Sequence, residues 1–201
     1  MSTGVVTSGP RQKKLLLELL PEQGDWSEED YLWLTDRTKR LVEFTDGHLE
    51  VLSMPTELHQ SILEYLYLLF HGFMVARGGK AHISGLRLRL RSGKFRVPDL
   101  LLLRDANDPR RQNQFWTGAD LVLEVVSKNN PQRDLVQKRR DYAQAGIPEY
   151  WIVNPLTETI LVYRLKGRKY PKAKTFARGT RATSQLFPDF SVSVDEVFDA
   201  N

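Results

Sequence analysis

The chain has 201 residues, of which 41% are hydrophobic and 27% charged, a composition typical of one globular domain rather than of a disordered chain. It contains no cysteine, which excludes disulfide scaffolds, thiol catalysis and cysteine-ligated zinc or iron–sulfur sites. The net charge of +4 permits an anionic partner without requiring one, and no apolar run approaches the roughly 20 residues that cross a bilayer. We therefore expect a soluble, cytoplasmic protein that does not act at a membrane.

The N-terminal residues carry few structural signals before a helix start. Residues 1–14 lack periodicity, and we expect 1–25 to form a tail and lead-in segment. Ser27 and Asp30 have the spacing of a capping box, with Asp in place of the usual Glu, and predict a short helix that ends near Thr35. A single domain is expected over 26–196, followed by a C-terminal tail over 197–201.

A β-hairpin is predicted next, because Asp46-Gly47 lies between alternating residues. Its register sets Glu43 opposite Glu50, and opposed like charges are unfavourable. Either both glutamates face water or a positive group lies over them, and both readings stay open. The predicted core face of the hairpin comprises Val42, Phe44, Leu49 and Val51.

The remaining elements follow from hydrophobic periodicity. A helix is expected over 59–76, and its wide apolar stripe predicts that it is covered on most sides. The alternation in 86–91 predicts a strand with three arginines on its polar face. Further expected elements are strands over 97–103, 121–126, 149–153 and 159–165, a helix over 131–145, an irregular basic segment over 166–182 and a strand pair around 184–194. This order predicts an α/β (α+β) single domain with a mixed sheet flanked by helices.

Two carboxylates stand inside apolar strand segments, where a charge is rarely buried unless it is paired or binds a metal. Asp99 precedes four leucines, and Glu124 lies within Leu121–Val126. If the two strands are neighbours, both carboxylates can converge on a hard divalent cation such as Mg²⁺ or Mn²⁺. Alternatively, each carboxylate lies at a strand end and pairs with an arginine.

An ordered set of motifs resembles the Uma2 family of restriction endonucleases, in the PD-(D/E)XK nuclease superfamily. The resemblance covers about 26–196 and is carried by Val97-Pro98-Asp99, Glu124-Val125-Val126-Ser127, Asp134-x3-Lys138-x3-Tyr142-x3-Gly146, Ile147–Trp151, Glu43-Phe44-x-Asp46-Gly47 and His59-Gln60. It implies a restriction-endonuclease-like mixed sheet and an active site in which Asp99 and Glu124 hold Mg²⁺ or Mn²⁺. It further implies that the Val125 carbonyl completes the protein ligands and that Glu43 lies near the metal.

The sequence departs from the superfamily pattern where the motif lysine is expected, because position 126 is a valine. Lys128 would lie roughly 13 Å along an extended strand from Glu124, too far for one side chain. Lys138, on the following helix, resembles a lysine moved onto that helix, and we favour it. The alternative is a plain Asp134–Lys138 helix pair.

Several residues are candidates for substrate binding. Arg87 and Arg89 line one strand face, and His59 and Lys128 lie near the motifs. Residues 164–181 hold eight basic residues and no acid, a pattern that suits phosphate contacts, although solvated surfaces explain it equally well.

The sequence therefore predicts a divalent-metal-dependent endonuclease that hydrolyses DNA phosphodiester bonds. Its rival is a catalytically inactive nucleic-acid-binding protein on a nuclease fold, and a structural or assembly module is a third, weaker reading. A homodimer would suit the cutting of both strands of a duplex, although no residue indicates one.

Overall fold

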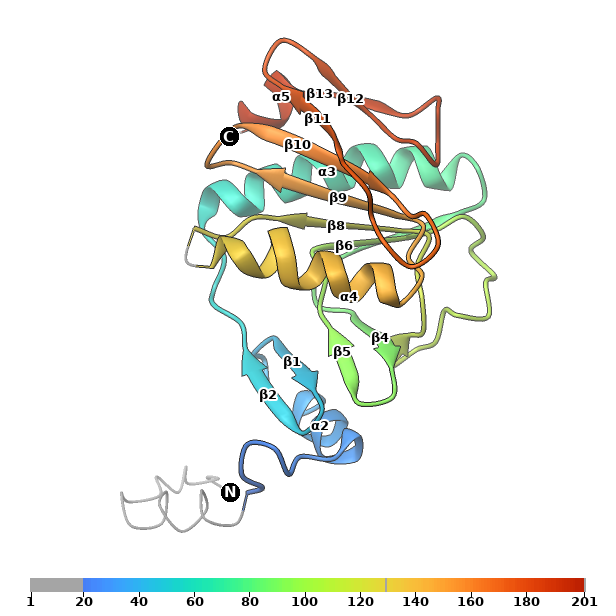
Figure 1. The fold of residues 1–201 in the computed structure, drawn as a ribbon. Coiled ribbons are helices and arrows are strands. Elements are labelled where there is room, and N and C mark those ends of the chain that lie inside the picture. Colours follow the sequence, from blue (N-terminus) through green and yellow to red (C-terminus); the bar gives the residue numbers. More distant parts are fainter. Residues whose placement is uncertain (1–19, 129, 201) are drawn as a thin grey trace, which may run out of the picture.

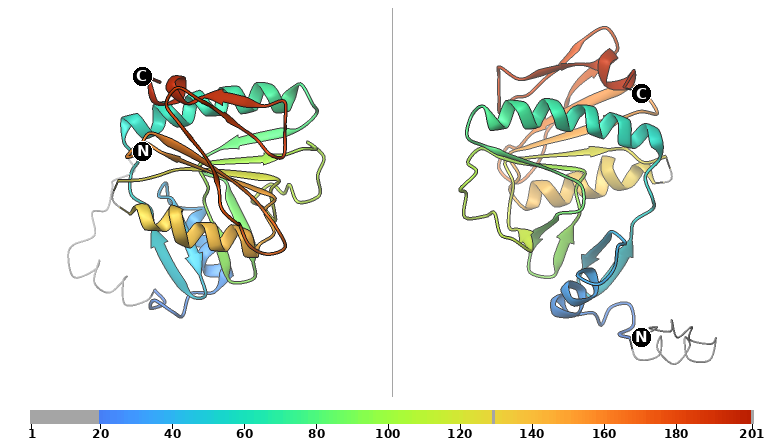
Figure 2. Two further views of the ribbon diagram at one scale, coloured as in Figure 1. Left: turned by 45° about the horizontal axis from the view of Figure 1, so that its top comes forward. Right: turned by 180° about the vertical axis from the view of Figure 1, so that it is seen from behind.

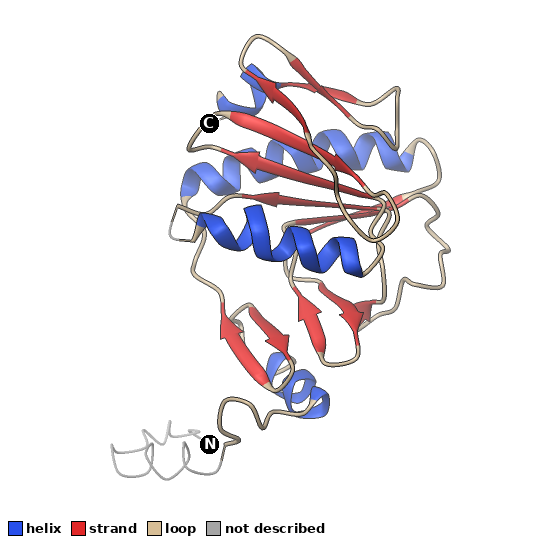
Figure 3. Ribbon diagram, in the orientation of Figure 1, coloured by secondary structure: helices blue, strands red, loops and turns tan. Residues whose placement is uncertain are grey.

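This computed structural model describes residues 20–128 and 130–200, so most of the expected N-terminal tail and residue 201 lie outside the described residues (Figures 1 and 3). The helical segments are α2 (Glu28–Thr35), α3 (Glu57–Val75), the π-helical turn η1 (Arg133–Lys138), α4 (Arg139–Gln144) and α5 (Val194–Phe198). The strands are β1 (Val42–Thr45), β2 (His48–Val51), β3 (Lys80–Ile83), β4 (Arg87–Arg91), β5 (Lys94–Arg96), β6 (Leu100–Leu103), β7 (Phe115–Trp116), β8 (Leu121–Val125), β9 (Glu149–Asn154), β10 (Thr159–Arg164), β11 (Lys174–Ala177), β12 (Arg181–Thr183) and β13 (Ser191–Ser193).

The main sheet has the order β11-β10-β9-β8-β6-β3, with β8 and β9 parallel and the other neighbours antiparallel. Helix α3 covers one face and α4 the other, as Figures 1 and 2 show. A second sheet, β2-β1-β5-β4-β7, lies below α4 in Figure 1, and β12 and β13 form a separate pair. The predicted mixed α/β domain with flanking helices is therefore confirmed.

The N-terminal elements form largely as their local signals predict. The hydroxyl of Ser27 accepts a hydrogen bond from the Asp30 backbone, and the Asp30 carboxylate accepts one from the Ser27 backbone, so the capping box is complete. The turn of the hairpin has positive φ at Asp46 and Gly47, as a tight hairpin turn requires. The segment before α2 is attached to this turn, because the Gly24 N–H donates to the Gly47 carbonyl.

The predicted core face of the hairpin is only half right. Val42 and Phe44 are buried, and Phe44 stacks on Tyr31. Val51 is instead 57% exposed, because β2 is the edge strand of the small sheet. Glu43, on the opposite face, is fully buried.

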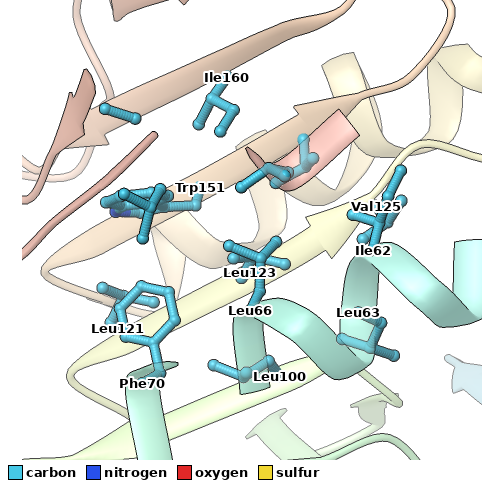
Figure 4. Packing of buried hydrophobic residues seen from close by; sticks show 14 of the residues in the cluster. Ile62, Leu63, Leu66, Phe70, Leu100, Leu121, Leu123, Val125, Trp151 and Ile160 are labelled. Carbon is cyan, nitrogen blue, oxygen red and sulfur yellow. The ribbon is translucent and has the colours of Figure 1, made fainter. Parts of the chain in front are cut away.

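The larger core lies between α3 and the main sheet. Figure 4 shows Leu66 and Phe70 of α3 against Leu123 of β8 and Trp151 of β9. The expectation that α3 is covered on most sides is wrong, since Leu68 is 62% exposed: the sheet covers one side of the helix and its outer apolar residues face out.

Several strands lie where sequence periodicity gave no signal. The expected irregular segment 166–182 contains β11, an edge strand of the main sheet, and β3 forms the other edge. Edge strands with lysines and exposed faces lack the apolar alternation that marks a strand. The expected strand over 97–103 begins only at Leu100, and the final pair begins at Arg181. Helix α5 continues across the expected boundary at 196 and buries Val197 and Phe198.

None of the helices within residues 20–128 and 130–200 is long and apolar enough to cross a membrane.

Candidate active site

Strands β6 and β8 bring the two predicted carboxylates together. Their register pairs Leu100 with Leu123, so Asp99, directly before β6, lies beside Glu124. The Val125 backbone N–H donates to Asp99 Oδ2 over 2.8 Å, which fixes this neighbourhood. The predicted convergence of the two strands on one site is therefore present.

The helix that follows β8 departs from the regular helix expected over 131–145, because Arg133–Lys138 form a π-helical turn. Such turns are rare and occur frequently at functional sites. Here the turn supplies two buried side chains, Asp134 and Lys138, whose carboxylate and ammonium are 3.2 Å apart.

Lys138 lies next to the strand carboxylate Glu124. Its Nζ lies 2.7 Å from Glu124 Oε2. Val126 instead packs into the apolar cluster that contains Tyr142. Lys128 lines the same cavity but is exposed, and no carboxylate of the described residues forms an ion pair with it. The structure thus brings Lys138, and not Lys128, to Glu124, and the Asp134–Lys138 helix pair exists as part of the same buried cluster.

The cluster concentrates negative charge in a buried place. Burial raises the pKa of Glu124 to about 8, Lys138 opposes the rise, and the charges of Asp99 and Asp134 add to it. Burial likewise raises the pKa of Asp134 despite Lys138. Burial alone would lower the pKa of Lys138, but Glu124, Glu43 and Asp134 hold it above its usual value. The ammonium therefore stays charged, and Glu124 carries negative charge only at a cost that a bound cation would relieve.

Glu43 lies on the second sheet behind this cluster. The predicted opposition of Glu43 and Glu50 is confirmed, and a positive group does lie over them. Arg133 bridges the pair, with Nη2 2.6 Å from Glu43 Oε2 and Nη1 2.5 Å from Glu50 Oε1. Arg96 and Lys138 approach Glu43 within 3.4 and 3.8 Å. Burial alone would raise the pKa of Glu43, but these three cations hold it below its usual value.

His59 lies in the first turn of α3, where Thr56 accepts a hydrogen bond from its backbone N–H. Its Nε2 is 3.2 Å from Asp99 Oδ2, and its Nδ1 is buried with no hydrogen-bond partner among the described residues. Burial alone would lower the pKa of His59, but the hydrogen bond to Asp99 holds it above its usual value.

One cavity of about 570 Å³ contains most of these groups, whereas Glu43 and Arg96 lie outside it. The predicted residues that line it are His59, Asp99, Glu124, Val125, Lys128 and Lys138. Met54 and Leu156 form part of its wall and are 81% and 50% exposed, so the polar cluster is reached past apolar side chains.

The two arginines predicted for substrate binding lie elsewhere. Arg87 and Arg89 are on β4, outside this cavity. Arg87 pairs with Asp36 over 2.7 Å and Arg89 pairs with Glu28 over 2.8 Å. Their charges are thus matched by acids at the two ends of α2.

Two residues that were not predicted as site residues complete the site, although Tyr142 belongs to the motif that contains Lys138. Tyr142 Oη donates to Glu124 Oε1 over 2.5 Å, and Arg133 joins the two glutamates of the hairpin. The four-residue spacing of Asp134, Lys138 and Tyr142 was a signal that all three share one helix face. No local pattern distinguishes Arg133 from other surface arginines.

The donor chemistry fits a hard divalent ion, although the set is small. Asp99, Glu124 and the Val125 carbonyl offer oxygen ligands, and Mg²⁺ is commonly held by one or two carboxylates plus water and substrate phosphate. Among the described residues, no group of three or more His, Cys, Asp or Glu side chains is arranged to hold a metal ion. Burial raises the pKa of Glu124 and the charges of Asp99 and Asp134 add to the rise, so a cation at this donor pair would favour the ionised carboxylate.

Comparisons with known proteins identify the family and the fold. The Uma2 family model, described as "Putative restriction endonuclease", matches residues 28–195. No curated protein matches the chain. A crystal structure described as a putative nuclease belonging to DUF820, from Anabaena variabilis, shares the fold with a TM-score of 0.71 and 18% identity. The match covers 86% of this chain and 97% of that one. Because the family model spans most of the sequence and ends within α5, the chain belongs to the Uma2 family.

Proposed function

We propose that this protein is a nuclease, and specifically an endonuclease that hydrolyses DNA phosphodiester bonds with Mg²⁺ or Mn²⁺. One observation carries the proposal: a buried ammonium, Lys138, lies 2.7 Å from Glu124 and belongs to the same cavity as Asp99. A protein that only binds nucleic acid has no need of this costly buried cluster, which weighs against the inactive alternative. The matching family description supports the nuclease class.

Asp99, Glu124 and the Val125 carbonyl would hold the ion. When bound, it would polarise the scissile phosphate and lower the pKa of a coordinated water. Hydrolysis then joins the water oxygen to phosphorus, breaks one phosphorus–oxygen ester bond and transfers a proton to the leaving alkoxide.

Lys138 would stabilise the charge that develops on the phosphate oxygens. An ammonium has three N–H donors. Glu124 and Asp134 lie within hydrogen-bond distance of Nζ, which leaves one donor for a phosphate oxygen. Glu43 would act as a positioning residue, because it lies 3.8 Å from Nζ and outside the cavity.

Cleavage of plasmid DNA with and without Mn²⁺ tests the proposal. Asp99→Ala and Glu124→Ala should abolish cleavage in proteins that remain folded by circular dichroism. Lys138→Ala should lower the rate by on the order of 10²-fold or more, the scale for removing one donor to a transition state. Lys128→Ala is the matched control and should lower it far less. Chelator-resistant cleavage, or loss with Lys128→Ala but not with Lys138→Ala, would contradict these assignments.

A further inference from the structure

A group of exposed cations lies at the far end of α4 from the cavity. We call it the basic face; it consists of Lys166, Arg168, Lys169 and Lys172. The side chains are exposed, and none forms an ion pair within the described residues. In Figure 1 the β10–β11 loop that carries all four lies beside the C-terminal end of α4.

The basic face differs from those surface arginines whose charge is already matched by an acid. Arg77, Arg91 and Arg178 each pair with at least one carboxylate. The acids of this helical segment, Asp134 in η1 and Asp141 in α4, are both buried, and Asp141 is matched by Lys94 and Arg96. Uncompensated positive charge therefore accumulates on one surface, as a partner with regularly spaced negative charges requires.

The loop presents its cations from an ordered turn. Lys166 and Lys169 exchange backbone hydrogen bonds of 3.0 and 3.2 Å around Gly167, whose φ is positive. Arg168 donates to the Gln144 carbonyl at the end of α4, and Tyr170 donates to the Ile147 carbonyl. The loop backbone and the Arg168 side chain are thus held at the end of α4, so less backbone ordering is needed when the loop binds a partner.

The helical segment connects this face to the cavity. Asn130, Arg133 and Lys138 line the cavity at its first turns, and Gln144 ends it beside the loop. At 1.5 Å per residue the segment spans about 20 Å, roughly six base pairs of B-DNA.

The aromatic residues here favour a duplex over a single strand. Single strands bind by stacking bases on free aromatic rings. The rings of Tyr163 and Tyr170 instead pack against each other at a tilt of 48°, with centroids 5.8 Å apart, and the Arg139 guanidinium lies over the Tyr163 ring. Cations without free stacking platforms suit the phosphate backbone.

We propose that the basic face binds the phosphate backbone of double-stranded DNA about six base pairs from the cleaved bond. This inference rests on the proposed function, since it assigns the path of that enzyme's substrate.

The test measures binding of a 20-base-pair DNA duplex across a salt series, with chelator present so that no cleavage occurs. Lys166→Gln/Lys169→Gln removes two charges of the face. Lys39→Gln/Lys80→Gln is the matched control, because it removes two charges without ion-pair partners elsewhere on the described surface. Lys80 lies on β3, at the opposite edge of the main sheet from β11.

The first variant should bind about tenfold or more weakly at 0.1 M salt, and the slope of log affinity against log salt should fall by about 1.8, or 0.9 per lost phosphate contact. The control should match wild type. Equal slopes for both variants, or equally tight binding of a 20-base-pair RNA duplex, would overturn the proposal. If the slope falls for Lys166→Gln/Lys169→Gln but the wild-type protein never cleaves DNA, the basic face binds DNA and the proposed endonuclease function is refuted. Cleavage with equal slopes would leave the endonuclease standing and refute the face.

Discussion

Replacing Glu43 by Gln should strongly destabilise the protein, because Glu43 is the buried counter-charge to three cations. Its carboxylate lies 2.6 Å from Arg133, 3.4 Å from Arg96 and 3.8 Å from Lys138, and it also accepts a hydrogen bond from the Val97 backbone. At an effective dielectric constant of about 20 these attractions total about 15 kcal/mol before desolvation is subtracted. Removing one partner of a buried ion pair typically costs about 3–5 kcal/mol.

For a domain of this size that loss corresponds to a fall of about 6–20 °C in melting temperature. Glu50→Gln is the matched control: Glu50 faces Glu43 in the register and also pairs with Arg133, but its side chain is 50% exposed. Such pairs contribute about 0–1 kcal/mol. Urea and thermal unfolding of the three proteins measure the difference.

The effect should depend on pH in a defined direction. The native pKa of Glu43 is held below its ordinary value of 4.5, so its contribution is fully present above about pH 4.5 and is lost as the pH falls through the lower native value. The gap between wild type and Glu43→Gln should therefore be constant from pH 7 to pH 5 and shrink below pH 4.5. Equal losses for the Glu43 and Glu50 variants, or a gap unchanged down to pH 3, would refute the account of this cluster.

Two further predictions concern the fold that carries the site. Glu149→Gln should lower the free energy of unfolding in urea by about 2–4 kcal/mol. The buried carboxylate accepts hydrogen bonds from the Trp151 indole, the Ser184 hydroxyl and two backbone N–H groups, and an amide cannot accept all four. An unchanged unfolding midpoint would contradict this. Gly47→Ala should lower the melting temperature more than Gly85→Ala. Both glycines have positive φ, but of the two only Gly47 would place a Cβ against backbone, 2.0 Å from the Gly24 carbonyl oxygen. Equal falls in melting temperature would contradict this.

Local signals in the sequence predicted the secondary-structure elements more reliably than they predicted which elements pack together. The capping box at Ser27 and the turn at Asp46-Gly47 act within a few residues, and both form as expected. The edge strand β11 was missed, because its residues do not alternate between apolar and polar and so give no periodic strand signal. The exposed outer side of α3 was also missed, since periodicity shows which residues are apolar but not what covers them.

The candidate site likewise contains residues that could be predicted from the sequence and residues that could not. Asp99, Glu124 and Lys138 could be named from motif order, and the chain brings them together. The partners of Arg87 and Arg89 could not be foreseen, because Asp36 and Glu28 reach them only through tertiary packing. The same holds for Arg133, which pairs with both Glu43 and Glu50 although it lies more than 80 residues away from them in the sequence.

Whether Asp99 and Glu124 hold a divalent ion is tested most directly by scanning fluorimetry with Mn²⁺ on wild type, Asp99→Asn and Lys138→Met. An ion at 100 times its dissociation constant stabilises by about 2.7 kcal/mol, which is about 5–11 °C for a domain of this size. Wild type should show such a rise. Asp99→Asn should gain little, because an amide is a poorer ligand, and Lys138→Met should still respond, because an ammonium is not a ligand. If wild type and Asp99→Asn shift equally, the ion binds elsewhere and the proposed metal site is wrong.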